Sequence, residues 1–147
     1  MASFHRRSVL AALIVGFSAA CTDKTARAPV SPVNSLEIVD LKTGEGASIA
    51  AGRQAVVQYT GWLYEASAPD KKGKQFDSSL RSGEPFRFTV GAGQVIKGWD
   101  QGVVGMKIGG SRRLTVPADL AYGQNGAGGV IPPGATLVFD VELMGIE

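Results

Sequence analysis

The residue types that most often carry out chemistry in proteins are scarce in this chain, whereas aromatic residues are concentrated in one part of it. After Cys21 the sequence contains no histidine and no further cysteine, but it contains nine aromatic residues, all between Tyr59 and Phe139. Histidine is the usual general base near neutral pH, and the common nucleophile and transition-metal sites rely on histidine or cysteine. The chain after Cys21 therefore offers few residues for general-base, nucleophilic or transition-metal catalysis. An apolar pocket with a few polar groups remains, which suits catalysis by desolvation and shape.

Cofactor and metal motifs do not fit the sequence either. Gly91-Ala92-Gly93 could begin a dinucleotide loop, but Ile96 occupies the position where that fingerprint needs Gly or Ala. No phosphate-binding Gly-Lys-Ser or Gly-Lys-Thr sequence occurs. The 13 acidic residues show no clustering that would indicate a metal site or a glycosidase pair. We therefore expect no metal and no cofactor.

Short strands must position the aromatic residues. Segments that alternate, or that are rich in β-branched and aromatic residues between turn residues, predict strands. They are residues 36–39, 55–64, 86–90, 112–116 and 137–143. In the last of these, the apolar residues from Leu137 to Leu143 share one face, while Asp140 and Glu142 lie on the other.

Only one segment has helical spacing. Ile96, Trp99, Val103 and Met106 follow one another at intervals of 3, 4 and 3, which predicts a short helix with one apolar stripe, ended by Gly105 and by the Gly109-Gly110 pair. A single amphipathic helix must bury that stripe against the sheet. We therefore predict one α+β domain over residues 36–147, in which a curved antiparallel sheet curls over one short helix.

Seven segments, taken in their order and spacing, carry a specific resemblance to a known family. They are Tyr59-Thr60-Gly61, Phe76-Asp77-Ser78-Ser79, Pro85-Phe86-Arg87-Phe88, Gly93-Gln94-Val95-Ile96-Lys97-Gly98-Trp99-Asp100, Gly105-Met106-Lys107, Ala121-Tyr122-Gly123 and the run from Ile131 to Leu143. Together they closely resemble the FKBP-type peptidyl-prolyl cis-trans isomerases, the receptors of macrolide immunosuppressants. The resemblance extends from about Leu36 to Ile146.

This resemblance implies a five- to six-stranded antiparallel sheet half-wrapped around the helix, with the active site between them. Trp99 would form the floor beneath the substrate proline ring. The walls would be Tyr59, Phe76, Phe86, Val95, Ile96, Ile131 and Phe139. The backbone N–H of Ile96 and the hydroxyl of Tyr122 would donate to ligand carbonyls, with the Asp77 carboxylate near the twisting amide. On pattern alone, Trp99 and Phe139 are better explained as plain core residues, and Asp77 could equally be a turn residue that caps local backbone.

The activity implied by the resemblance is a cofactor-free peptidyl-prolyl cis-trans isomerase that acts on proline-containing polypeptides and is inhibited by macrolide immunosuppressants. Rotation about an X–Pro bond makes and breaks no covalent bond, so it needs no nucleophile. The main alternative is a chaperone module that binds proline segments with little turnover. A lipocalin-like carrier would need a closed barrel, and an interior helix argues against it. The short connection from Pro117 to Pro132 has no room for the chaperone domain that some relatives insert there.

The N-terminal segment predicts export. A basic start at residues 5–7 precedes an apolar run, and residues 1–21 therefore resemble a signal peptide. The run ends in a lipobox-like sequence at Cys21, which predicts lipid attachment there and a periplasmic protein anchored to a bacterial membrane. Ordinary signal cleavage to a soluble periplasmic protein is the alternative. Residues 22–35 are predicted to be a flexible tether that cannot supply a dimerisation helix, so we expect a monomer.

The charge balance depends on that N-terminal segment. Residues 1–21 contain two of the 15 Lys and Arg residues and none of the 13 Asp and Glu residues, which leaves 13 of each sign. The remaining chain is neutral overall, so nucleic-acid binding is not expected.

The three lysines Lys71, Lys72 and Lys74 are interpreted as part of a solvated loop. They lie in the connection formed by residues 65–74, which is longer than in the shortest relatives. Phe88 and Val141 are expected in the core.

Overall fold

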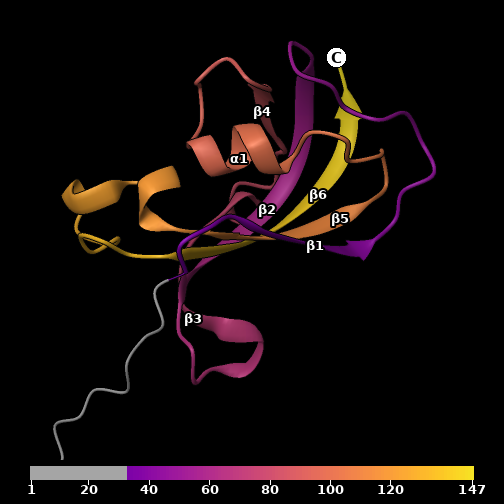
Figure 1. Ribbon diagram of the computed structural model, residues 1–147. Helices are drawn as coiled ribbons and strands as arrows, with labels where there is room; N and C mark the ends of the chain where they lie inside the picture. The colour runs from indigo at the N-terminus through magenta and orange to yellow at the C-terminus, as the bar shows by residue number, and fades with distance from the viewer. Residues whose placement is uncertain (1–32) are drawn as a thin grey trace, which may run out of the picture.

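The computed structural model describes residues 33–147, in which six antiparallel strands form one sheet (Figure 1). The strands are β1 (Glu37–Lys42), β2 (Gln54–Tyr64), β3 (Lys72–Ser78), β4 (Phe86–Thr89), β5 (Ser111–Val116) and β6 (Leu137–Ile146). Their order is β1-β5-β6-β2-β3, and β4 pairs with β2 beyond the end of β3. The expected α+β class and antiparallel sheet are confirmed. The predicted signal peptide over 1–21, Cys21 and most of the 22–35 tether lie outside the described residues.

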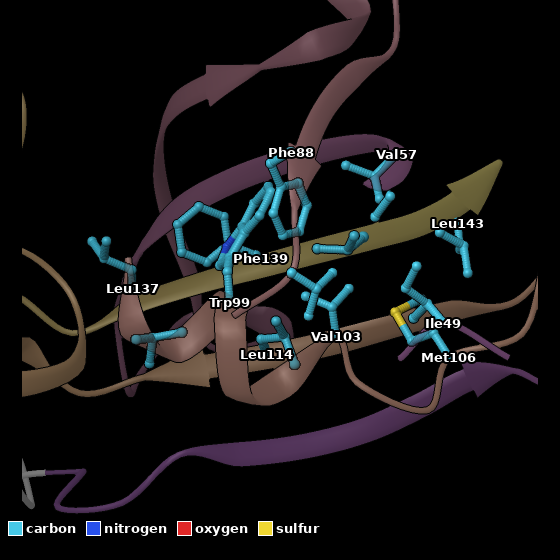
Figure 2. Packing of buried hydrophobic residues seen from close by; sticks show 14 of the residues in the cluster. Ile49, Val57, Phe88, Trp99, Val103, Met106, Leu114, Leu137, Phe139 and Leu143 are labelled. Carbon is cyan, nitrogen blue, oxygen red and sulfur yellow. The ribbon is translucent and has the colours of Figure 1, made fainter. Parts of the chain in front are cut away.

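The sheet face that lies toward the helix forms the core. The predicted alternation in β6 is confirmed, because its inward residues from Leu137 to Leu143 are buried and Glu142 on the other face is exposed. Phe88 and Val141, both expected in the core, are each 1% exposed. Figure 2 shows Phe88, Phe139 and Trp99 packed together in the layer between helix and sheet. This layer includes Trp99, which forms the floor of the candidate site described below.

The one α-helix among residues 33–147 is α1 (Lys97–Gly102), which is shorter than its spacing predicts. The predicted extension to Met106 is wrong, because Gly105 adopts a φ of 84° and its N–H donates to the Ile49 carbonyl at 2.9 Å. Val103 and Met106 are nevertheless buried, since the Ile49 N–H donates to the Met106 carbonyl at 2.8 Å and holds this segment against the core. No helix in the described part of the chain is long and apolar enough to cross a membrane.

Two glycines bring α1 unusually close to β5. A Cβ atom on Gly102 would lie 2.7 Å from Cδ2 of Leu114, and one on Gly98 would collide with both methyl groups of Val116. Residues four apart lie on the same face of a helix, so both glycines face the sheet. The helix can therefore rest directly on β5, and this contact sets how deeply Trp99 is placed.

The sequence pattern does not predict β3, and its description as part of a solvated connection is wrong for Lys72. Together with the short 3-10 helix η1 (Pro69–Lys71), β3 extends away from the rest of the sheet (Figure 1). The Lys72 ammonium nitrogen lies 2.6 Å from the Asp140 carboxylate and 4.0 Å from the centre of the Trp62 ring. Arg113 donates two further hydrogen bonds to Asp140, at 2.7 and 3.0 Å. These side-chain contacts lie on the outer face of the sheet, opposite α1, and tie the start of β3 to β5 and β6.

Candidate functional site

Six of the nine aromatic residues after Cys21 meet at a pocket between α1 and the sheet. The pocket has a volume of about 160 Å³. It is lined by Tyr59, Phe76, Asp77, Phe86, Gln94, Val95, Ile96, Trp99, Tyr122 and Phe139. These residues come from β2, β3, β4, β6, α1 and two connecting loops, so segments far apart in the sequence must all be in place to form it.

Trp99 forms the floor of this pocket. Its side chain projects from α1 and is 4% exposed. The rings of Tyr59 and Phe139 stand nearly perpendicular to the indole, with centroids 4.9 and 5.3 Å away, and Phe88 packs from the core side at 5.5 Å (Figure 2). Such edge-to-face pairs are favourable beyond the apolar area that they bury. Within residues 33–147 the Trp99 indole N–H is the one buried side-chain polar atom without a hydrogen-bond partner. Apart from this N–H, the floor is an apolar surface fixed by the packed aromatic rings.

A short hydrogen bond connects two walls of the pocket. The Tyr59 hydroxyl donates to Oδ2 of Asp77 at 2.6 Å, and the Ser78 amide donates to Oδ1 at 2.8 Å. Burial, followed by the hydrogen bond and the charge of Asp77, raises the pKa of Tyr59 well above that of a free tyrosine. Asp77 itself is exposed rather than buried. A carboxylate that keeps contact with solvent and accepts two hydrogen bonds carries little desolvation cost.

Gly61 allows the two phenylalanine walls to meet. In the β2–β3 pair, Gly61 lies opposite Asp77. A Cβ atom at Gly61 would lie 2.7 Å from Cζ of Phe76 and 2.8 Å from Cε1 of Phe139. The two rings stand edge to face above it, with centroids 5.6 Å apart. A side chain at this position would push these rings apart and alter the shape of the pocket.

The turn between β4 and α1 forms the opposite side of the pocket. It supplies Gln94, Val95 and Ile96 to the lining. Ile96 is the N-cap residue of α1, and its backbone N–H donates no hydrogen bond within the described part of the chain. A free amide donor therefore lies at the edge of an apolar cavity, where a carbonyl of a bound ligand could accept from it.

Tyr122 completes the rim. It lies between the 3-10 helices η3 (Ala118–Leu120) and η4 (Gly123–Asn125) and is 40% exposed. Burial of the phenol, together with the nearby charge of Asp77, raises the pKa of Tyr122. Its hydroxyl takes part in none of the side-chain hydrogen bonds formed among residues 33–147. It is therefore a protonated donor that a ligand can reach.

The structure brings together most of the residues expected at the site. The residues that line the pocket as expected are Tyr59, Phe76, Asp77, Phe86, Val95, Ile96, Trp99, Tyr122 and Phe139. Ile131 does not line it; the residue is 6% exposed and belongs to the core, where its amide and carbonyl bond to Ala127. Gln94 lines the pocket although it is not among the expected site residues. The only signal for Gln94 is its place in the Gly93-to-Asp100 segment, because a polar residue in a turn is otherwise unremarkable in sequence.

A second cleft does not offer comparable chemistry. It lies between residues 40–44 and 105–112, has a volume of about 180 Å³ and has no aromatic lining. The Arg112 guanidinium within it is already bound by Asp40 at 2.6 Å and by the Gly102 carbonyl at 2.8 Å. Residues 33–147 also contain no group of three or more His, Cys, Asp or Glu side chains that could hold a metal ion. The aromatic pocket is therefore the candidate site.

Comparison with known proteins agrees with this geometry. The model of the FKBP-type peptidyl-prolyl cis-trans isomerase family matches residues 45–144. An FK506-binding protein of Neisseria meningitidis serogroup A is 52% identical over 112 residues, which covers 76% of this chain and 96% of the relative. FK506-binding protein 1 of Dictyostelium discoideum is 50% identical over 109 residues, covering 74% and 95%.

Solved structures show the same fold. The crystal structure of AtFKBP13 superimposes with a TM-score of 0.65 at 38% identity and covers 76% of this chain and 93% of that one. The crystal structure of FkpA from Escherichia coli gives a TM-score of 0.65 at 39% identity, covering 77% and 48%. With the family model matched over most of the described residues and relatives matched over nearly their whole length, this chain belongs to the FKBP-type peptidyl-prolyl cis-trans isomerases.

Proposed function

We propose that the pocket above Trp99 accelerates rotation about X–Pro bonds by holding the proline ring in an apolar cavity. The barrier to that rotation is about 18–20 kcal/mol because amide resonance must be broken, and uncatalysed exchange takes roughly tens to hundreds of seconds. A twisted amide loses its charge-separated resonance form and becomes less polar. An apolar cavity therefore stabilises the twisted state more than the planar one.

Three polar groups complete the proposed mechanism. The free N–H of Ile96 and the hydroxyl of Tyr122 donate to substrate carbonyls, and Asp77 lies beside the twisting amide while Tyr59 holds its carboxylate in place. Each ~1.4 kcal/mol of preference for the twisted state gives about a tenfold increase in rate. A thousandfold acceleration requires about 4 kcal/mol, which desolvation and one or two hydrogen bonds can supply.

The observation that supports this proposal most strongly is the aromatic floor, and the chain provides a matched control for it. The other tryptophan, Trp62, lies on the outer face of the sheet beside Lys72. We expect Trp99→Leu to lower kcat/KM for a proline peptide by about tenfold or more, and Trp62→Leu to leave it within about twofold. If the two variants had equal activity, Trp99 would not be the floor of the active site. Binding of the peptide without faster exchange would instead favour the chaperone alternative.

We also propose that the pocket binds FK506-type macrolides, as the names of the relatives indicate for those proteins. Such a ligand would occupy the cavity above Trp99 and compete with the proline peptide. Fluorescence titration of the wild-type chain and of Trp62→Leu would detect quenching of Trp99. Competitive inhibition of exchange is expected; tight binding without inhibition would place the macrolide elsewhere.

The proposed location of the protein rests on the N-terminal sequence alone. We propose that residues 1–21 direct export, that Cys21 is acylated, and that residues 22–35 tether a monomeric catalytic domain of residues 36–147 to a membrane in the periplasm. Its substrates would then be proline-containing polypeptides of the cell envelope. Mass spectrometry of the native N-terminus tests this directly. A diacylated or triacylated Cys21 is expected, and an unmodified N-terminus would contradict the anchor.

A further inference from the structure

The turn between β4 and α1 has to place two parts of the active site relative to each other. On one side it carries Val95 and Ile96 of the wall, and on the other it leads directly into α1 and Trp99 of the floor. The turn is exposed from Gly91 to Gln94, so core packing alone does not fix its conformation. Two of its residues, Gly91 and Gly93, adopt positive φ angles of 81° and 72°. Glycine is flexible in this region, so another group must hold the turn in one conformation.

Asp100 provides that group. It follows Trp99 in α1, and its carboxylate reaches back over the turn. Oδ1 accepts a hydrogen bond from the Gly91 amide at 2.9 Å, and Oδ2 accepts one from the Gly93 amide at 3.1 Å. Asp100 forms no ion pair within residues 33–147, so these two amides are its partners in the fold. One side chain thus binds both glycine amides that define the turn.

A second side chain supports the same turn from the β4 side. Oε1 of Gln94 accepts a hydrogen bond from the Thr89 amide at 2.9 Å. The Gln94 contact spans the turn from its end back to β4, whereas the Asp100 contact ties its middle to α1. Between them, the backbone from Gly91 to Ile96 is connected to both neighbouring elements. The Asp100 contact is the one that also involves the element carrying Trp99.

We infer that Asp100 is a positioning residue for proline isomerisation. Its carboxylate holds the middle of the turn against α1, and so sets how the wall formed by Val95 and Ile96 stands relative to the Trp99 indole. This inference rests on the proposed roles of Trp99 and Ile96. Hydrogen bonds that involve a charged group are stronger than neutral ones, so a carboxylate suits this task. Small misplacements of groups that orient a substrate reduce catalysis strongly.

Two variants separate positioning from general stability. Asp100→Ala removes both acceptors, whereas Asp100→Asn keeps one acceptor and turns a donor toward the other amide. We expect kcat/KM for a proline peptide to fall by about tenfold in Asp100→Ala and by about threefold in Asp100→Asn. Asp119→Ala is the matched control, because Asp119 is an exposed aspartate outside the pocket lining. It should retain wild-type kcat/KM.

The assays are made on the full-length chain well below the melting temperature of every variant, so that all molecules are folded. Hydrogen exchange read by NMR should show faster exchange of the Gly91 and Gly93 amides in Asp100→Ala, with the amides of β2 and β6 unchanged. A merely structural role would lower the melting temperature but leave the kcat/KM of folded molecules within about twofold of wild type, which would overturn the inference. If Asp100→Ala fails to fold, the kcat/KM of Asp100→Asn is compared with that of wild type instead. An inactive wild-type chain would instead contradict the proposed function.

Discussion

At the scale of single residues, the Tyr59–Asp77 hydrogen bond organises the pocket before any substrate is present. The 2.6 Å contact joins β2 to β3 and fixes the Tyr59 ring, which in turn stands edge-on to Trp99 at 4.9 Å. The hydroxyl is already committed to Asp77, so it is not free to donate to a ligand. The Ile96 amide and the Tyr122 hydroxyl make no such bond within residues 33–147, and we propose that they donate to substrate carbonyls.

The raised pKa of Tyr59 gives a prediction about stability and pH. A phenol whose pKa is higher in the folded state contributes stability below its ordinary pKa of about 10, and that contribution is lost as the pH rises through the folded-state value. Tyr59→Phe should therefore lower the free energy of unfolding by about 1 kcal/mol near neutral pH. The difference from wild type should shrink above about pH 10. Urea unfolding followed by circular dichroism at several pH values measures it; a difference that grew with pH would contradict this explanation.

Candidate site residues could be predicted from the sequence where they lie in segments whose order and spacing are distinctive. Trp99, Phe139 and Asp77 lie in distinctive segments, and the structure places all three around the pocket. Ile131 and Gln94 show the limit of such reasoning. Whether an apolar residue beside the site turns inward to the core or toward the cavity depends on a local backbone bridge, here Ala127 with Ile131, that no residue pattern specifies.

At the scale of elements, α1 lies close to the sheet because two of its residues have no side chain. Gly98 and Gly102 allow α1 to rest on Val116 and Leu114 without intervening side chains. A helix of six residues has little intrinsic stability in isolation, so this contact and the buried Trp99 must hold it in place. The depth of the pocket floor therefore depends on two glycines that touch no ligand.

Gly98→Ala tests this close contact. Alanine is a better helix former than glycine by about 1 kcal/mol, so an isolated helix would become more stable. Here the added methyl group would overlap Val116, and we expect a net loss of about 1–3 kcal/mol in the free energy of unfolding, together with reduced kcat/KM because Trp99 is displaced. Gln101→Ala, at an exposed position of the same helix, should be neutral or slightly stabilising. A Gly98→Ala protein at least as stable as Gln101→Ala in thermal unfolding would show that the contact is not restrictive.

The helix and β3 also show why elements were only partly predictable. The apolar spacing from Ile96 to Met106 correctly indicates that Trp99, Val103 and Met106 are buried, but the helix ends early because backbone bonds to Ile49 replace its last turn. Lys72 to Gln75 lacks apolar alternation, so β3 is not visible in the sequence. It exists because it pairs with the end of β2, and tertiary pairing of this kind leaves no local pattern.

At the scale of the whole molecule, one carboxylate on the outer face of the sheet links several strands to one another. Asp140 on β6 binds Arg113 on β5 and Lys72 on β3, so it connects three strands that are distant in sequence. Burial alone would raise the pKa of Asp140, but the hydrogen bonds from Arg113 and Lys72 outweigh it and hold the pKa below its usual value. The cluster lies on the face opposite the pocket, so it should affect stability rather than catalysis.

Asp140→Asn should lower the free energy of unfolding by about 1–3 kcal/mol near neutral pH, because Lys72 loses its charged partner and Arg113 keeps only the longer ion pair with Asp70. A lowered folded-state pKa contributes stability above the ordinary aspartate pKa of about 3.9, and this contribution is lost as the pH falls through the folded-state value. The difference from wild type should therefore disappear in acid. Glu142→Gln, on the same strand and face but with no ion pair to residues 33–147, is the control. An Asp140→Asn variant with wild-type stability at neutral pH, or with large loss of kcat/KM, would contradict this assignment.

The proposed mechanism accelerates X–Pro rotation in an apolar pocket without a titrating base. Its most direct test is NMR measurement of cis–trans exchange in a proline-containing peptide, with catalytic amounts of the protein, at several pH values. We expect exchange at least about tenfold faster than the uncatalysed rate. We expect kcat/KM to change by less than about twofold between about pH 6 and pH 9, since no histidine follows Cys21 and burial raises the pKa of Tyr59 and Tyr122. Exchange no faster than in the peptide alone would contradict the activity, and a steep titration of kcat/KM in that range would contradict the mechanism.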